Sequence, residues 1–280
     1  MSSPIGARAG VAAVVVAVVA VLALVITLIV VLSRSEIGAR PRCTITAPPD
    51  SPGLPATWTL SPEQADSAAT IAGVGRRLGV PDRAVTIALA TAIQESTLAN
   101  LRGGDRDSLG LFQQRPSQGW GSEEEILDPV YSSTAFYEAL LQVPNWATMD
   151  ITVAAQTVQR SGFPEAYADH EPEARLMAVS LLGQAPGSWT CVDLPATPAA
   201  DPGSGAVAEL AASELGTRRL SGAQEPEAGW AIATWLVAHA ERLALESVTF
   251  DGRTWSVGSG AWEQTGPADG RLALRRLGQP

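Results

Sequence analysis

The chain has 280 residues, 46% of them hydrophobic, and a net charge of −10. This length allows one or two domains of ordinary size. Acidic residues are spread along the sequence and no basic stripe occurs, which argues against a nucleic-acid-binding protein. All positive charges are arginine, and Ala, Gly and Pro are abundant, a composition that indicates the GC-rich genome of a high-GC bacterium.

The N-terminal segment contains an apolar run from Val11 to Leu32 that only Thr27 interrupts. A run of this length can cross a bilayer as one helix, which takes about 20 residues. The residues after Leu32 do not form a small-residue cleavage site, so we predict an uncleaved signal anchor at 11–32. Residues 1–10 are then a cytoplasmic N-terminus. Residues 33–57, rich in Pro, Arg and Ser, are predicted to be a linker.

The first helix expected beyond the linker begins at Ser61, a capping residue that Pro62 follows, and ends at Gly79. A second helix runs through residues 84–95, with Val85, Ala88 and Ala92 on one apolar face. Glu95 continues that face at the end of the helix. Desolvation favours the protonated form of a carboxylic acid, which is the form that a general acid needs. Glu95 is therefore the candidate catalytic residue, and the simpler alternative is a carboxylate that pairs with Arg102 or Arg106.

A glycine-rich loop over residues 98–121 follows, and a long loop inside a compact domain is often functional. Three more helices are expected: one from Asp128-Pro129, one from Asp150 or Thr152 to about Arg160, and one over residues 172–182. Short helices around such a loop predict an all-α lobe.

The pair Glu95-Ser96, followed by Ser108-x-Gly110-Leu111-Phe112-Gln113, resembles the signature of the lysozyme-like soluble lytic transglycosylase superfamily. The resemblance implies an all-α lysozyme-like domain over residues 58–191. It also implies cleavage of the MurNAc–GlcNAc bond of peptidoglycan with Glu95 as the single acid and base. Ser108, Gly110 and Gln113 would bind the glycan, and Trp120 or Trp146 could stack on sugar faces.

The family often has a Tyr-Asn-x-Gly segment on a later helix, where this chain has residues 158–164. Gln159 could supply the amide and Tyr167 the phenol, so both are candidate substrate-binding residues. Many glycosidases need a second carboxylate, and Asp105 and Asp107 are the candidates in the loop. Both lie among Gly and Arg residues, which favours a solvated or arginine-paired role for each. Lytic transglycosylases need none, because the N-acetyl group of the substrate assists and the 6-hydroxyl closes an anhydro ring.

The two cysteines, Cys43 and Cys191, flank the lysozyme-like segment. An even count around one domain predicts a disulfide in an oxidising compartment. Arginines are more frequent after the predicted span than before it, which by the positive-inside rule would place the bulk of the chain in the cytoplasm. The cysteines and the cell-wall resemblance favour the opposite orientation: a single-pass protein of the cell membrane with most of the chain outside.

Residues 192–205 are rich in Pro and Gly and predict a second linker before a C-terminal domain at 206–280. A helix is expected over residues 229–243, then strands at 247–250 and 254–257 around the turn Asp251-Gly252. His239, Asp251, Arg253 and Trp255 resemble a small α+β domain of secreted actinobacterial cell-wall proteins. That domain should fold independently, and a partner in the cell wall is possible for it. The terminal His/Asp/His cluster of those proteins is missing, so we expect no metal and treat His239 as a surface or packing residue.

The predicted fold class is thus mainly α: a transmembrane helix, an all-α lysozyme-like domain and a small α+β domain. The predicted function is extracytoplasmic cleavage of peptidoglycan strands without a cofactor. Two alternatives stay open, a hydrolytic muramidase and a non-catalytic protein of glycan binding or cell-wall assembly.

Overall fold

The computed structural model describes residues 21, 22, 24, 25, 40–161, 165–195, 203 and 205–278. Residues 41–280 form one compact unit, and residues 1–40 form another. Only four residues of the predicted span 11–32 are described, so that span lies almost wholly outside the described part. No helix within the described residues is both long and apolar enough to cross a membrane.

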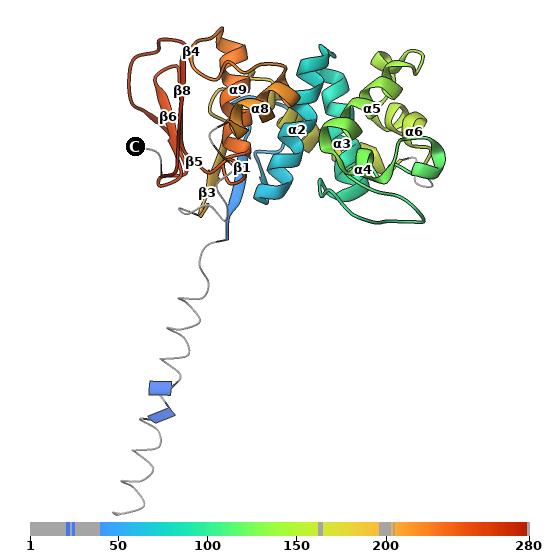
Figure 1. Cartoon of the computed structure of the whole chain (residues 1–280), viewed down its shortest axis with the longest axis horizontal. Helices are drawn as coiled ribbons and strands as arrows, with labels where there is room; N and C mark the ends of the chain where they lie inside the picture. The colour runs from blue at the N-terminus through green and yellow to red at the C-terminus, as the bar shows by residue number, and fades with distance from the viewer. Residues whose placement is uncertain are drawn as a thin grey trace, which may run out of the picture. The chain divides into compact units, whose positions relative to one another are not determined.

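The predicted fold class is wrong, because the compact unit is a mixed fold with two antiparallel sheets (Figure 1). The first sheet has the order β2-β1-β3, and the second has the order β4-β8-β5-β6-β7. The strands are β1 (Arg42–Thr46), β2 (Thr57–Leu60), β3 (Trp189–Val192), β4 (Gly222–Ala223), β5 (Leu245–Phe250), β6 (Arg253–Ser256), β7 (Trp262–Gln264) and β8 (Arg271–Arg276). Strand β1 lies inside the segment that was predicted to be a linker.

The helices of the first part agree well with the capping signals in the sequence. Helix α2 begins after Ser61 with a complete capping box and ends at Gly79, whose backbone is left-handed. Asp128 caps α5 through its side chain. The helices are α2 (Pro62–Leu78), α3 (Asp82–Ser96), α4 (Glu123–Leu127), α5 (Pro129–Leu141), α6 (Ile151–Gln159), α7 (Glu171–Leu181), α8 (Ala206–Leu215) and α9 (Pro226–Ala238). The described residues also include the 3-10 helices η1 (Pro116–Gln118), η2 (Trp146–Thr148) and η3 (Ala166–His170).

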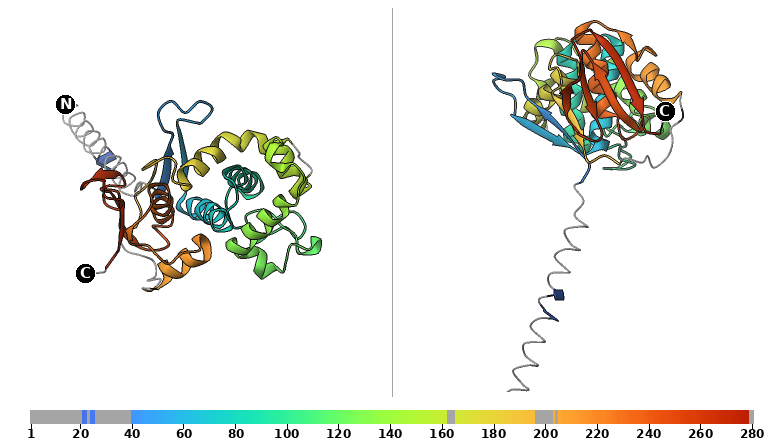
Figure 2. Two further views of the ribbon diagram at one scale, coloured as in Figure 1. Left: turned by 90° about the horizontal axis from the view of Figure 1, so that it is seen from above. Right: turned by 90° about the vertical axis from the view of Figure 1, so that its left-hand side faces the viewer.

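The small sheet joins the two ends of the lysozyme-like segment. Strand β1 pairs antiparallel with both β2 and β3, and Cys43 lies directly opposite Cys191. These cysteines form the predicted disulfide, across 148 residues of sequence. Figure 2 shows the β1–β2 hairpin at the edge of the compact unit, with α2 and the C-terminal elements beside it. The lobe is therefore closed by a sheet that the all-α prediction did not contain.

The C-terminal elements pack against the rest of the compact unit. The expected helix and hairpin are confirmed as α9, β5 and β6, whereas α8, β4, β7 and β8 were not predicted. Helix α9 contacts α2, α7 and β3, and α8 contacts α2. Gly183, just after α7, has a φ of 86°, and a Cβ added there would lie 2.1 Å from the carbonyl oxygen of Glu227. Residues 192–205 thus do not separate two compact units.

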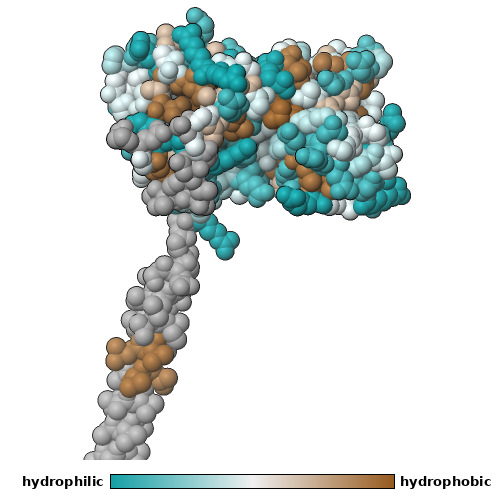
Figure 3. Space-filling view, in the orientation of Figure 1, coloured by the Kyte–Doolittle hydropathy of each residue, from teal (hydrophilic) through white to brown (hydrophobic). Residues whose placement is uncertain are grey.

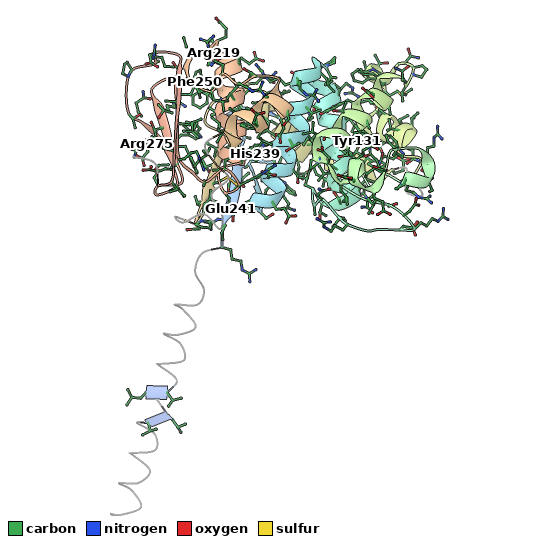
Figure 4. All side chains as sticks on the ribbon, in the orientation of Figure 1. Tyr131, Arg219, His239, Glu241, Phe250 and Arg275 are labelled. Carbon is green, nitrogen blue, oxygen red and sulfur yellow. A yellow bond between two sulfur atoms is a disulfide. The ribbon has the colours of Figure 1, made fainter. Side chains whose placement is uncertain are left out.

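A buried cluster of charged side chains lies between α2, α8 and α9. His239 is fully buried, with Nδ1 2.5 Å from Asp66 Oδ1 and Nε2 2.9 Å from Glu214 Oε2. Glu214 also accepts hydrogen bonds from Thr70 and from the indole of Trp235. Figure 4 labels His239 where α9 faces α2. Of the two predicted roles for His239, the surface position is wrong because the side chain is fully buried, and the packing position agrees with the structure. The contacts of His239 also link the C-terminal elements to α2.

The electrostatics of this cluster favour a charged histidine. Burial opposes protonation of His239, but the carboxylates of Asp66 and Glu214 outweigh it and raise its pKa to about 9. Burial likewise opposes ionisation of Asp66, yet the positive charges of His239 and Arg242 hold its pKa below the ordinary value. An imidazolium with a carboxylate at each nitrogen satisfies both donors. The cluster is therefore a set of paired charges inside the folded protein.

Candidate functional site

Glu95 lies in the last turn of α3, one residue before the helix ends. Its side chain is half-buried, and its Oε1 accepts a hydrogen bond of 2.6 Å from the hydroxyl of Tyr167. Tyr167 belongs to η3 and is fully buried. Burial raises the pKa of Tyr167 above its ordinary value of 10, and the hydrogen bond to Glu95 adds to this rise. The phenol therefore remains a donor that holds one oxygen of the carboxyl group in place.

Helix η3 contacts the end of α3 at two consecutive side chains. His170 Nε2 lies 2.8 Å from Gln94 Oε1, next to the Tyr167–Glu95 hydrogen bond. Two contacts from one short helix restrict the rotation of η3 against α3. The orientation of the Glu95 carboxyl group is thus set by a neighbouring element as well as by its own helix.

The turn that carries the Gly-Leu-Phe-Gln sequence is held by short backbone pairings. Leu109 and Gln114 exchange two backbone hydrogen bonds, and the amide of Gly110 donates to the carbonyl of Leu101. Gln113 has a φ of 47°, which is uncommon for a residue other than glycine and marks a tight bend. The bend fixes the position of the Gln113 backbone, from which its side chain extends.

Two side chains attach this turn to the helices on either side. The Ser96 hydroxyl lies 2.7 Å from the carbonyl oxygen of Leu111, and Gln159 Nε2 donates to the carbonyl of Phe112 at 2.6 Å. Ser96 belongs to α3 and Gln159 to α6, so both helices hold consecutive carbonyls of the turn. The role of Ser96 was missed, although its place beside Glu95 in the sequence could have suggested it.

The residues predicted to bind glycan therefore differ in what they can reach. Gln159 has its amide nitrogen engaged with Phe112, and Tyr167 is engaged with Glu95. Ser108 is 7% exposed and offers little surface to a ligand. Gln113 is half-buried, and its Nε2 lies 3.3 Å from the carbonyl of Gly110. Of these side chains, Gln113 has the most favourable position for contact with a substrate.

Two glycines fit the loop closely around this turn. Gly110 is buried with a φ of 76°, and an added Cβ would lie 2.7 Å from the carbonyl oxygen of Ile126. Packing against α4 accounts for this glycine, whereas the sequence suggested close approach to a sugar. An added Cβ at Gly104 would overlap the side-chain oxygen of Gln113. Gly104 thus leaves the space that the Gln113 side chain occupies.

The two candidate second carboxylates have other contacts. Asp107 accepts from Arg115 Nε at 2.7 Å and from the backbone amide of Ser117 at 2.8 Å. Hydrogen bonds from Ser117 and then from Arg115 hold the pKa of Asp107 well below its usual range. The side chain of Asp105 is 92% exposed beside Arg106. Asp107 therefore shapes the loop as a permanent anion, and Asp105 faces solvent.

The two tryptophans that could stack on sugars, Trp120 and Trp146, contact the hydrophobic core and not Glu95. Trp120 and Trp146 are both half-buried and pack against the core. Trp120 also lines a cleft of about 610 Å³ together with Gln159. Residues 162–164, part of the segment compared with Tyr-Asn-x-Gly, lie outside the described residues. Within the part of the chain that the structure describes, no cluster of three or more His, Cys, Asp or Glu residues could hold a metal ion.

No protein-family model matches this chain, and no curated protein matches its sequence.

Proposed function

We propose that this protein cleaves the glycan strands of peptidoglycan, with Glu95 as the acid and base, by the lytic transglycosylase route. The observation that carries the proposal is the Glu95 carboxyl group, oriented by the buried Tyr167 and adjoining a turn that Ser96 and Gln159 fix from two helices. A catalytic acid needs this kind of fixed geometry before substrate arrives. The resemblance of residues 95–113 to the transglycosylase signature supplies the substrate class.

The chemistry divides between the two oxygens of Glu95. Oε1 is occupied by Tyr167, so Oε2 is the oxygen that can protonate the bridging oxygen of the glycosidic bond. Protonation allows the bond to the anomeric carbon to break, with the N-acetyl carbonyl of the same sugar stabilising the positive charge. The ionised Glu95 then accepts the proton of the 6-hydroxyl as that oxygen attacks the anomeric carbon. The product has an anhydro end, and no water is consumed.

The contacts of the loop carboxylates support this route over hydrolysis. Both oxygens of Asp107 accept hydrogen bonds, and Asp105 lies in solvent beside Arg106. Neither has the free, enclosed position from which a carboxylate activates water against the sugar. Assistance from within the substrate removes the need for a second carboxylate.

A location outside the cytoplasm belongs to the same proposal. The disulfide between Cys43 and Cys191 is of a kind that forms and persists in oxidising compartments. Peptidoglycan lies in such a compartment, so the enzyme and its substrate would meet there. No cofactor enters this mechanism.

The test is incubation of the purified full-length protein with peptidoglycan, followed by mass analysis of the released muropeptides. We expect anhydro ends from the unmodified protein and no products from Glu95→Gln, which keeps size and removes the acid. Glu138→Gln, an exposed change on α5, serves as the matched control and should retain activity. Reducing ends would identify a hydrolytic muramidase instead. Binding without products, or activity in Glu95→Gln, would reject the proposed catalysis.

A further inference from the structure

A polar cleft lies beside the Gln159 side chain. It has a volume of about 610 Å³, between η1, the end of α5 and the end of α6. Its lining includes Gln118, Trp120, Gln142, Pro144, Gln159 and Arg160. The other residues of the lining are uncharged, so Arg160 is the single charge there. The cleft offers one cation, several amides and one aromatic surface.

The side chains in this cleft are available to a ligand. Gln118, Gln142 and Arg160 are exposed, and none has a side-chain hydrogen bond or ion pair within the described residues. Arg115 in the loop differs from Arg160, since it pairs with Asp107 at 2.7 Å. A guanidinium without a carboxylate partner, in a chain with a net charge of −10, is a local site for an anion.

The backbone at Arg160 supports a role for its side chain. Arg160 ends α6 with a φ of 54°, in the left-handed conformation that glycine adopts with less strain. Cations also stabilise the C-terminus of a helix, so this contribution must be measured separately. Thermal unfolding of the variants is therefore measured together with binding.

The cleft is connected to the candidate site by Gln159. Its side chain lines the cleft, and its Nε2 holds the carbonyl of Phe112, which precedes Gln113. The turn and the cleft therefore share the Gln159 side chain. A substituent of a glycan strand bound at the turn would have to pass Gln159 to reach Arg160 and Trp120.

We propose that this cleft binds the peptide substituent of the glycan strand, with Arg160 pairing a peptide carboxylate and Gln118 and Gln142 contacting peptide amides. The inference rests on the proposed function, and it names the part of the substrate that a second region of the protein recognises. In a peptide-bearing strand the lactyl carboxyl group of MurNAc is an amide, so the free carboxylate that can pair with the cation lies on the peptide. Amide side chains can both donate to and accept from a peptide backbone.

The binding test uses two soluble probes, a disaccharide-peptide with a free carboxylate and the same disaccharide without its peptide, whose lactyl carboxyl group is capped as an amide. Calorimetry with the full-length protein should show tighter binding of the peptide-bearing probe. Arg160→Gln should weaken that binding by about tenfold or more, the loss typical of one charge-assisted contact, and leave the peptide-free probe unaffected. Arg271→Gln, an exposed arginine on β8, is the matched control and should bind both probes as the unmodified protein does.

The outcomes separate this inference from the proposed function. Arg160-dependent binding of the peptide probe without any cleavage of peptidoglycan would support the cleft and reject the catalysis. Cleavage with equal binding of the two probes, or no effect of Arg160→Gln, would reject the cleft and leave the catalysis standing. Weaker binding accompanied by a lower melting temperature in Arg160→Gln is resolved by measuring both probes at a temperature at which this variant is fully folded. If selectivity for the peptide probe is still lost there, the pairing with a carboxylate is supported. If selectivity returns, a structural role of Arg160 explains the weaker binding, and the inference fails.

Discussion

His239 should titrate near pH 9 in the folded protein, well above the ordinary value of 6.5. The imidazole is fully buried and has a carboxylate at each nitrogen, Asp66 and Glu214. The difference between 6.5 and about 9 corresponds to roughly 3 kcal/mol, at about 1.4 kcal/mol for each tenfold change in the equilibrium. Replacing one carboxylate, in Asp66→Asn, should lower the pKa of His239 and reduce this stabilisation.

The sign of the effect on stability follows from the direction of the shift. Below pH 6.5 His239 is protonated in both the folded and the unfolded chain, so its contribution is fully present. As the pH rises from 6.5 to about 9, only the folded chain keeps the proton, and the free energy of unfolding falls. Asp66 acts in the opposite direction. Its pKa in the folded chain lies below the ordinary value of 3.8, so its contribution to stability is lost as the pH falls below 3.8. The cluster is most stabilising between these two limits.

The assay is an NMR titration of the imidazole protons, which is simple because the chain has two histidines. The variant His170→Gln leaves a single signal and so assigns His239. Urea unfolding at pH 6 and at about pH 9.5 then measures the loss of stability, and Asp66→Asn should show a smaller loss. A His239 signal that titrates at or below pH 6.5 would refute the reasoning.

Three further predictions concern the site and the packing. Tyr167→Phe should lower the rate of glycan cleavage about tenfold with the fold intact, because it removes the donor to Glu95; an unchanged rate would show that the hydrogen bond is dispensable. The double change of Cys43 and Cys191 to alanine should lower the free energy of unfolding by about 3–5 kcal/mol, since the bridge closes a loop over 148 residues; equal midpoints in urea would contradict this. Gly183→Ala should cost roughly 2 kcal/mol or more, and clearly more than Gly79→Ala, whose Cβ would meet no atom within 4 Å.

Features with a local physical cause could be predicted from the sequence. Ser61 and Gly79 delimit α2 because a capping side chain and a left-handed glycine act within one turn of helix. The turn Asp251-Gly252 joins β5 to β6 for the same reason, since its backbone conformation depends on those two residues. The helix end that carries Glu95 could be predicted because its apolar spacing and the turn after it are close in sequence.

Features that depend on distant segments had no such signal. Strand β1 lies in a stretch rich in Pro and Arg, and its pairing with β3 joins Cys43 to Cys191 far along the chain. Short strands of this kind carry too few residues for a recognisable alternation. The burial of His239 likewise depends on Asp66, which belongs to another helix. Within the site, the contact between Tyr167 and Glu95 could not be read from spacing, because η3 and α3 meet only in the folded chain.

The buried interface also changes what the C-terminal segment can do alone. Residues 204–280 contain His239 and Glu214, but Asp66 and Thr70, which complete their contacts, lie on α2. Without α2 the cluster would lose one carboxylate, and the faces of α8 and α9 that contact α2 would meet water. A segment this short has little core to offset that loss. We therefore expect residues 204–280, expressed alone, to show an unfolded circular dichroism spectrum and no cooperative melting, in contrast to the full-length protein. A native-like spectrum with a sharp transition would restore the independent domain that the sequence suggested.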